Sequence, residues 1–134
     1  MWKDIERIDR DVLRKGSRFY HNWLRERMSD GTVVGYLVEE MGGRAIASGL
    51  VMLREMDPPP GGGTRVIPHI ISMFTEKDQR GKGIGTAVVN ALLDWSKNNK
   101  YRGVTLDAAP KARPLYSRLG FRRYWGMVYS FSKR

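Results

Sequence analysis

The chain lacks cysteine and contains only two histidines, His21 and His69. Without cysteine there are no disulfides, no thiolate-bound metals and no covalent intermediate on a cysteine sulfur. Two imidazoles are too few for a histidine metal cage, so we expect no metal.

No segment approaches the roughly 20 apolar residues that span a bilayer, and residues 1–7 lack the apolar core of a signal peptide. We therefore expect a cytoplasmic protein with no membrane partner.

Acidic side chains are scarce in the C-terminal portion of the chain. Residues 1–78 hold 12 Lys+Arg and 12 Asp+Glu, whereas residues 79–134 hold 12 and 2, which accounts for the net charge of +10. A positive field of this kind attracts a polyanion, such as nucleic acid or a phosphorylated cofactor. The charge alone does not distinguish nucleic acid from a phosphorylated cofactor as the partner.

The length of 134 residues predicts a single domain, 1–134.

Two helices are predicted at the start of the chain. Ile5, Ile8, Val12 and Leu13 have helical spacing within residues 4–14. Ser17 is a candidate N-cap for a second helix that ends at Asp30 and Gly31.

Residues 32–40 and 44–54 are rich in β-compatible side chains and flank Gly42 and Gly43, which predicts an antiparallel hairpin. The Pro- and Gly-rich residues 57–63 are predicted to form a surface loop, and residues 66–75 the third strand.

The second half alternates between helical and strand patterns. Apolar side chains recur at helical spacing from Ile84 to Trp95, which predicts a helix packed on a sheet by one face. A strand at residues 103–107, a short helix at 111–119 and an aromatic strand or hairpin at 121–131 are expected to follow. The element order indicates a mixed α/β sheet with helices on its faces.

The segment from Arg80 to Thr86 lies between a predicted strand and a predicted helix and contains three glycines. Glycines let backbone N–H groups crowd together, and the helix start adds unpaired donors and a positive dipole end. We therefore predict a phosphate cradle here.

The glycine spacing separates three classes of phosphate loop. A P-loop needs glycine where Glu76 stands and Ser or Thr where Gly83 stands, so this class is excluded. A dinucleotide fingerprint needs G-x-G-x-x-G, whereas the chain has G-x-G-x-G. Asp107 does lie about 20 residues further on, where a ribose-binding acid is expected, which keeps this class as the runner-up. What remains is R-x-x-G-x-G, formed by Arg80, Gly83 and Gly85.

This hexapeptide resembles the pyrophosphate-binding motif of the GNAT superfamily of N-acetyltransferases. Residues 106–121, with Leu115, Tyr116, Gly120 and Phe121, look like the later motif of the superfamily, which lines the thiol end of the cofactor. The resemblance covers residues 33–131. It implies a mixed, mostly antiparallel sheet with helices on both faces, of the acyl-CoA N-acyltransferase type. The superfamily has a strand before its first helix, and we find none ahead of Asp4.

The resemblance implies acetyl-CoA as the acetyl donor and a small-molecule or peptide amine as the acceptor. A bulge would splay a pair of parallel strands and free a backbone N–H for the thioester carbonyl, with Met73 and Thr75 supplying the backbone contacts. The cofactor-binding residues expected are Met73, Phe74, Thr75, Arg80, Gly81, Lys82, Gly83, Ile84, Gly85 and Thr86.

Two catalytic residues are expected. Tyr116 matches the general acid of the superfamily it resembles, a phenol that protonates the departing CoA sulfur. His69 is a candidate general base, because strand alternation places it on the face of Met73 and Thr75 and some superfamily members have a glutamate base at this position. A water chain, Glu76 and Glu39 are the other candidates for the base. With no cysteine, we expect direct attack by the amine in a ternary complex.

Two rival functions would also use the basic C-terminal half of the chain. A nucleic-acid-binding module would stack bases on Tyr101, Tyr124, Trp125 and Tyr129, although alternation of Trp125, Tyr129 and Phe131 along one strand favours a core role. A regulator would bind acyl-CoA without turnover. We do not expect nucleic acid to be the partner, and we include a homodimer among the possible assemblies.

Overall fold

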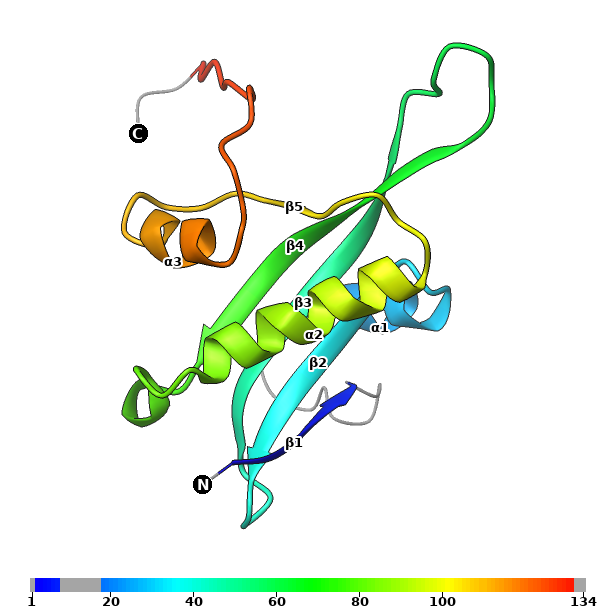
Figure 1. Ribbon diagram of the computed structural model, residues 1–134. Helices are drawn as coiled ribbons and strands as arrows, with labels where there is room; N and C mark the ends of the chain where they lie inside the picture. The colour runs from blue at the N-terminus through cyan, green and yellow to red at the C-terminus, as the bar shows by residue number, and fades with distance from the viewer. Residues whose placement is uncertain (1, 8–17, 132–134) are drawn as a thin grey trace.

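The computed structural model describes residues 2–7 and 18–131, and Figure 1 shows its arrangement. Five strands form one sheet in the order β1-β2-β3-β4-β5. β1 (Trp2–Arg7), β2 (Val33–Glu40), β3 (Ala45–Met56) and β4 (Arg65–Thr75) pair antiparallel, whereas β5 (Thr105–Leu106) runs parallel to β4. The prediction of a mixed, mostly antiparallel sheet is confirmed.

Helices cover both faces of this sheet. α2 (Ile84–Asn98) packs on one face through Ile84, Val88, Val89 and Leu92, which join the larger buried core. α1 (Arg18–Ser29) lies on the other face, where Leu24 packs with Val33 and Leu50. α3 (Arg113–Arg118) contributes Tyr116 to the α2 face. The predicted hairpin, third strand and long helix are confirmed within a few residues.

The first strand of the sheet corrects the sequence analysis. Residues 2–7 form β1, with Ile5 opposite Val38 and Arg7 opposite Tyr36, so the strand not found from the sequence is present. The helix predicted over residues 4–14 is wrong for its first four residues, and residues 8–17 lie outside the described segments of the chain. A few apolar residues at helical spacing are a weak signal, and backbone pairing with β2 outweighs it.

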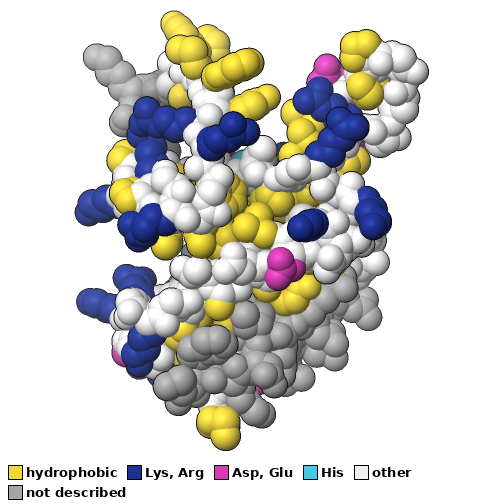
Figure 2. Space-filling view, viewed as in Figure 1, with side chains coloured by type: hydrophobic (Ala, Val, Ile, Leu, Met, Phe, Trp, Pro, Cys, Tyr) yellow, Lys and Arg dark blue, Asp and Glu magenta, His cyan; other side chains and the backbone are white. Residues whose placement is uncertain are grey.

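The predicted final strand or hairpin is also wrong. Residues 121–131 form neither a helix nor a strand. We call residues 122–131 the C-terminal arm; Tyr124, Trp125, Met127, Val128, Tyr129 and Phe131 in it are 79–98% exposed. The core role expected for Trp125, Tyr129 and Phe131 is therefore contradicted. Hydrophobic side chains gather at the top of Figure 2, where Figure 1 draws this segment in red.

Candidate active site where two strands diverge

A β-bulge in β4 decides which side chains share a face. Leu50 pairs with Ser72 and Val51 pairs with Ile70, so Ile71 is an extra residue on β4. The bulge reverses the alternation of side chains between the two halves of the strand. Strand regularity in the sequence does not reveal such an insertion.

His69 therefore lies on the opposite face of the sheet from Met73, contrary to expectation. His69 is opposite Met52, which packs with the α1 cluster, whereas Met73 is opposite Gly49 and packs with the α2 cluster. Thr75 follows Met73 on the α2 face, where its Oγ1 would lie 3.6 Å from a β-carbon on Gly85. Phe74, between them, is 48% exposed.

The bulge also marks the place where β4 and β5 stop pairing. Their described pairs are His69 with Thr105 and Ile70 with Leu106, immediately before the extra residue Ile71. We call this place the strand divergence. Beyond it the backbone of residues 72–75 pairs with β3 on one side and, among the described residues, with no strand on the other. A free strand edge of this kind offers N–H and C=O groups to a ligand.

Residues 80–86 form what we call the glycine elbow, which leads from the end of β4 into α2. Gly81 and Gly83 have φ values of 81° and 79°, a conformation that favours glycine. Gly83 is the N-cap of α2, and its carbonyl accepts the N–H of Ala87 at 3.1 Å. The first turn, with Ile84 buried and Thr86 half-buried, leaves the initial N–H groups of the helix without intrahelical partners.

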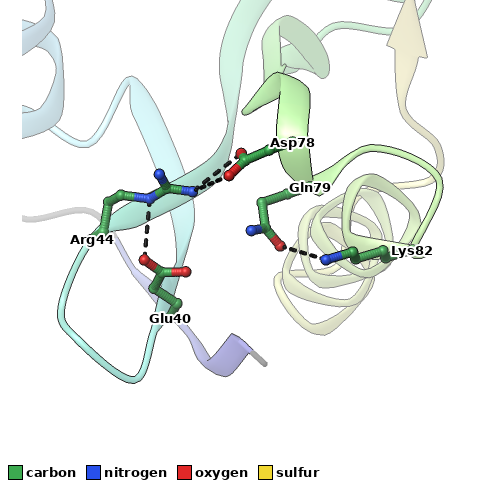
Figure 3. Close-up of polar contacts among 5 residues, drawn as sticks. All are labelled: Glu40, Arg44, Asp78, Gln79 and Lys82. Atoms are coloured by element: carbon green, nitrogen blue, oxygen red, sulfur yellow. Dashed lines mark hydrogen bonds and ion pairs between the residues drawn. The ribbon is translucent and has the colours of Figure 1, made fainter.

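Cationic side chains border the glycine elbow. The Arg80 Nε donates to the Thr75 carbonyl at 3.1 Å, which ties the elbow to the end of β4. The Lys82 Nζ donates to the Gln79 Oε1 at 3.3 Å (Figure 3). Both residues are exposed, so they can meet an anion placed over the helix start.

An ion-pair group holds the 3₁₀ turn Lys77–Gln79 that precedes the elbow. A nitrogen of the Arg44 guanidinium donates to both Asp78 oxygens at 3.0 and 3.2 Å, and the Arg44 Nε lies 3.2 Å from the Glu40 Oε1 (Figure 3). The hydrogen bond from Arg44 lowers the pKa of Asp78 and raises that of Arg44. Sequence reasoning missed Arg44, because 34 residues separate it from Asp78 and no motif links them.

Tyr116 lies in α3 on the α2 face of the sheet. It packs against the same core cluster as Met73, and its ring meets that of Phe121 edge-on, with centroids 5.6 Å apart. Burial raises the pKa of the Tyr116 phenol, which keeps the hydroxyl protonated at neutral pH. A protonated phenol can donate a proton to a leaving group.

His69 is 5% exposed, and both of its ring nitrogens have partners. The Nδ1 is 2.6 Å from the Thr105 Oγ1, and the Nε2 is 3.4 Å from the Asp107 Oδ2. Burial and, secondly, the Arg54 charge lower the pKa of His69, while Asp107 opposes them. The sequence alone does not connect Thr105 or Asp107 with His69, because their proximity depends on the pairing of β5 with β4.

The other two candidate bases, Glu76 and Glu39, lie at the ends of strands. The Glu76 N–H donates to the Ile46 carbonyl at 2.7 Å just after β4, and Glu39 is at the end of β2.

Within residues 2–7 and 18–131, no group of three metal-ligating side chains is found. No helix among the described residues is both long and apolar enough to cross a bilayer.

Comparisons with known proteins agree on one family. A model of the acetyltransferase (GNAT) family matches residues 2–121. Glucosamine 6-phosphate N-acetyltransferase of Trypanosoma brucei brucei is 30% identical over 98 residues, 73% of this chain and 65% of its own length. An uncharacterized N-acetyltransferase of Methanocaldococcus jannaschii is 32% identical over 114 residues, 81% of this chain and 46% of its own. The chain thus spans about two thirds and about half of these curated relatives.

Solved structures share the fold. A GCN5-related N-acetyltransferase from Ralstonia eutropha superposes with a TM-score of 0.80 at 21% identity, covering 96% of this chain and 97% of the other. A protein from Clostridium acetobutylicum described as a predicted acetyltransferase, solved with acetyl-CoA, gives a TM-score of 0.79 at 19% identity, covering 96% of each chain. The chain belongs to the GNAT family of acetyltransferases.

Proposed function

We propose that this protein is an N-acetyltransferase that transfers the acetyl group of acetyl-CoA to a primary amine by direct attack in a ternary complex. The observation that carries the proposal is the glycine elbow at the start of α2, separated by one 3₁₀ turn from a strand that diverges from its parallel neighbour at a bulge. Family membership supports the same activity. The proposal treats residues 1–134 as one catalytic domain, and the cytoplasmic location remains a prediction.

The residues present fit the cofactor. The backbone N–H groups of residues 81–86 and the side chains of Arg80 and Lys82 would hold the pyrophosphate. The open edge of β4 at Met73, Phe74 and Thr75 would hold the pantetheine arm through backbone groups. When bound, the cofactor supplies an activated acetyl thioester.

We assign the general acid to Tyr116. Its phenol stays protonated at neutral pH and lies on the face of Met73, whose backbone we assign to the cofactor arm. His69 lies on the other face with both nitrogens engaged, so we place it in the acceptor half of the site. A water chain then takes the proton from the attacking amine, and Glu76 remains the alternative to it.

The acceptor proposed for first testing is a phosphorylated amino sugar. One curated relative is named as a glucosamine 6-phosphate N-acetyltransferase. The net charge of +10, all of it from residues 79–134, favours an anionic acceptor over a polycation by attraction. Glucosamine 6-phosphate, a polycationic aminoglycoside and a peptide with a free amino terminus therefore form the acceptor panel.

The decisive experiment measures CoA thiol release with this panel and acetyl-CoA binding by calorimetry. With at least one amine, the native chain should turn over, and Tyr116→Phe should lower kcat by about a hundredfold or more while acetyl-CoA affinity is unchanged. Tyr101→Phe is the matched control, because Tyr101 stacks on Trp95 away from α3. Failure to bind acetyl-CoA, or binding without turnover of any amine, would reject the proposal.

The nucleic-acid alternative is not favoured by the family match. The exposure of Tyr124 and Trp125, whose rings stack with centroids 6.0 Å apart, nevertheless makes a direct test worthwhile. Titration with a single-stranded oligonucleotide should give no saturable binding at physiological salt.

For the assembly, we propose a homodimer formed through the C-terminal arm, because such an interface would cover the apolar side chains of the arm.

A further inference from the structure

The segment between β4 and α2 has little packing to hold it in place. None of the side chains of residues 76–83 is buried, whereas Ile84, the first residue of α2, is 1% exposed. At Gly81 and Gly83, nothing lies within 4 Å of the place that a β-carbon would occupy. Because apolar burial is the main source of local stability, the course of this segment depends on polar contacts.

Two polar contacts attach the segment to neighbouring parts of the sheet. The Glu76 N–H donates to the Ile46 carbonyl of β3 at 2.7 Å, which fixes where the 3₁₀ turn Lys77–Gln79 begins. Inside the turn, the Asp78 carboxylate accepts from the Arg44 Nη2 at 3.0 and 3.2 Å. The ion pair therefore ties the middle of the turn, just before the glycine elbow, to the hairpin of β2 and β3.

Arg44 is itself held in a defined place by the turn of this hairpin. The Glu40 N–H donates to the Arg44 carbonyl at 3.0 Å, and the Gly43 N–H donates to the Glu40 carbonyl at 2.8 Å. The Glu40 carboxylate also lies 3.2 Å from the Arg44 Nε, which orients the guanidinium and leaves its Nη2 to Asp78 (Figure 3). A planar guanidinium can meet two carboxylates through separate N–H groups in fixed directions. The hairpin thus presents a preformed partner to the turn.

We propose that Arg44 is a positioning residue for the cofactor, which holds the 3₁₀ turn through Asp78 so that the glycine elbow is arranged for the pyrophosphate before CoA binds. The inference rests on the proposed function, which assigns the pyrophosphate to the elbow. A segment that is already ordered loses less conformational entropy on binding than one that the ligand must order. Loss of the ion pair should therefore weaken CoA binding without slowing acetyl transfer once the cofactor is bound.

A direct effect of charge on the pyrophosphate makes a different prediction. Loss of Arg44 removes a positive charge near the elbow, whereas loss of Asp78 removes a negative one. If only the electric field mattered, Arg44→Gln would weaken CoA binding and Asp78→Asn would strengthen it. If the ion pair positions the elbow, both variants weaken binding, and the double variant weakens it about as much as either alone, because all three lose the same contact.

Calorimetry with CoA and steady-state kinetics test the proposal. Arg44→Gln and Asp78→Asn should each raise the Kd for CoA about three- to fivefold, the amount that a well-oriented exposed ion pair can contribute. Both should raise KM for acetyl-CoA and leave kcat unchanged with the amine that is turned over. Arg25→Gln, which removes an exposed cation from α1 on the other face of the sheet, is the matched control and should leave the Kd unchanged. Urea unfolding of each variant separates a loss of global stability from a loss of affinity.

Hydrogen exchange gives a second readout, specific to the segment. In the free chain, the amides of residues 77–83 should exchange faster in Arg44→Gln than in the native chain, and saturating CoA should reduce the difference. Tighter CoA binding by Asp78→Asn, or an unchanged Kd in Arg44→Gln, would overturn the positioning role while leaving the transferase intact. Failure of the native chain to bind acetyl-CoA would reject the proposed function instead, so the two failures are distinguishable.

Discussion

Gly49 on β3 lies opposite Met73 on β4, and the Met73 Sδ is 2.6 Å from the place that a β-carbon on residue 49 would occupy. The Val88 Cγ1 of α2 is equally near, and the Leu92 Cδ1 is at 3.1 Å. The helix that begins at the glycine elbow, α2, therefore packs directly against the backbone of Gly49, where there is no room for a side chain. Gly49 sets how close α2, and with it the elbow, lies to the strand proposed to bind the cofactor arm.

Substitution of Gly49 by alanine should destabilise the protein. The added methyl group overlaps a β-branched side chain on a helix, which cannot rotate freely, so we expect a loss of about 1–3 kcal/mol in the free energy of unfolding. Urea denaturation measures it. Gly42→Ala is the control, because nothing lies within 4 Å of a β-carbon there, and it should change stability little. Equal stability of the two variants would contradict the close packing of α2.

Removal of the cations at the glycine elbow should weaken CoA binding. Arg80→Ala and Lys82→Ala should each raise the Kd for CoA by about tenfold, the size expected for a hydrogen bond to a charged group. Their losses should shrink as salt rises, because exposed charges are screened. Lys97→Ala, in the last turn of the same helix, is the control and should leave the Kd unchanged. Calorimetry at two salt concentrations decides the outcome.

The elements predicted well from sequence are those encoded locally. The hairpin from β2 to β3 follows from strand-forming residues around Gly42 and Gly43, and α2 follows from apolar spacing after a glycine-rich turn. The bulge at Ile71 has no local signature, since the apolar residues around it read as one regular strand. The orientation predicted for His69 failed for that reason.

Other features depend on pairing across the sheet. β1 is defined by its register with β2, and its own six residues give a weak signal. The contacts of His69 with Thr105 and Asp107 require β5 beside β4, and that of Arg44 with Asp78 joins a hairpin turn to the approach to α2. No sequence motif links these residues, so only the three-dimensional structure reveals that they are in contact.

The pKa of His69 predicts a dependence of stability on pH. Because its pKa in the folded protein is lowered from 6.5, the unfolded chain binds this proton more readily, and a fall in pH favours unfolding. The contribution is complete above pH 6.5 and is lost as the pH falls from 6.5 toward the lowered pKa. The slope from this group is at most about 1.4 kcal/mol per pH unit.

Urea unfolding between pH 5 and 7.5 tests this effect. The free energy of unfolding of the native chain should decline on the acidic side, and His69→Gln should have a flatter profile over the same range. Arg54, whose charge also lowers the pKa of His69, provides a second variant: Arg54→Gln should reduce the slope without abolishing it. A profile unchanged by His69→Gln would contradict the burial of a neutral imidazole.

The C-terminal arm predicts self-association that strengthens with salt. Its exposed aromatic and aliphatic side chains form the kind of apolar surface that monomers seldom leave uncovered, whereas the net charge of +10 opposes the approach of two copies. Light scattering after size exclusion should show the dimer fraction rising with protein concentration and with salt, because salt screens the repulsion but not the apolar contact. The double variant Trp125→Ser, Tyr129→Ser should be monomeric under the same conditions. Met41→Ser, which removes an exposed apolar side chain between β2 and β3, should leave the dimer intact. A native chain that stays monomeric at high salt, or a dimer that survives the double variant, would show that the arm is not the interface.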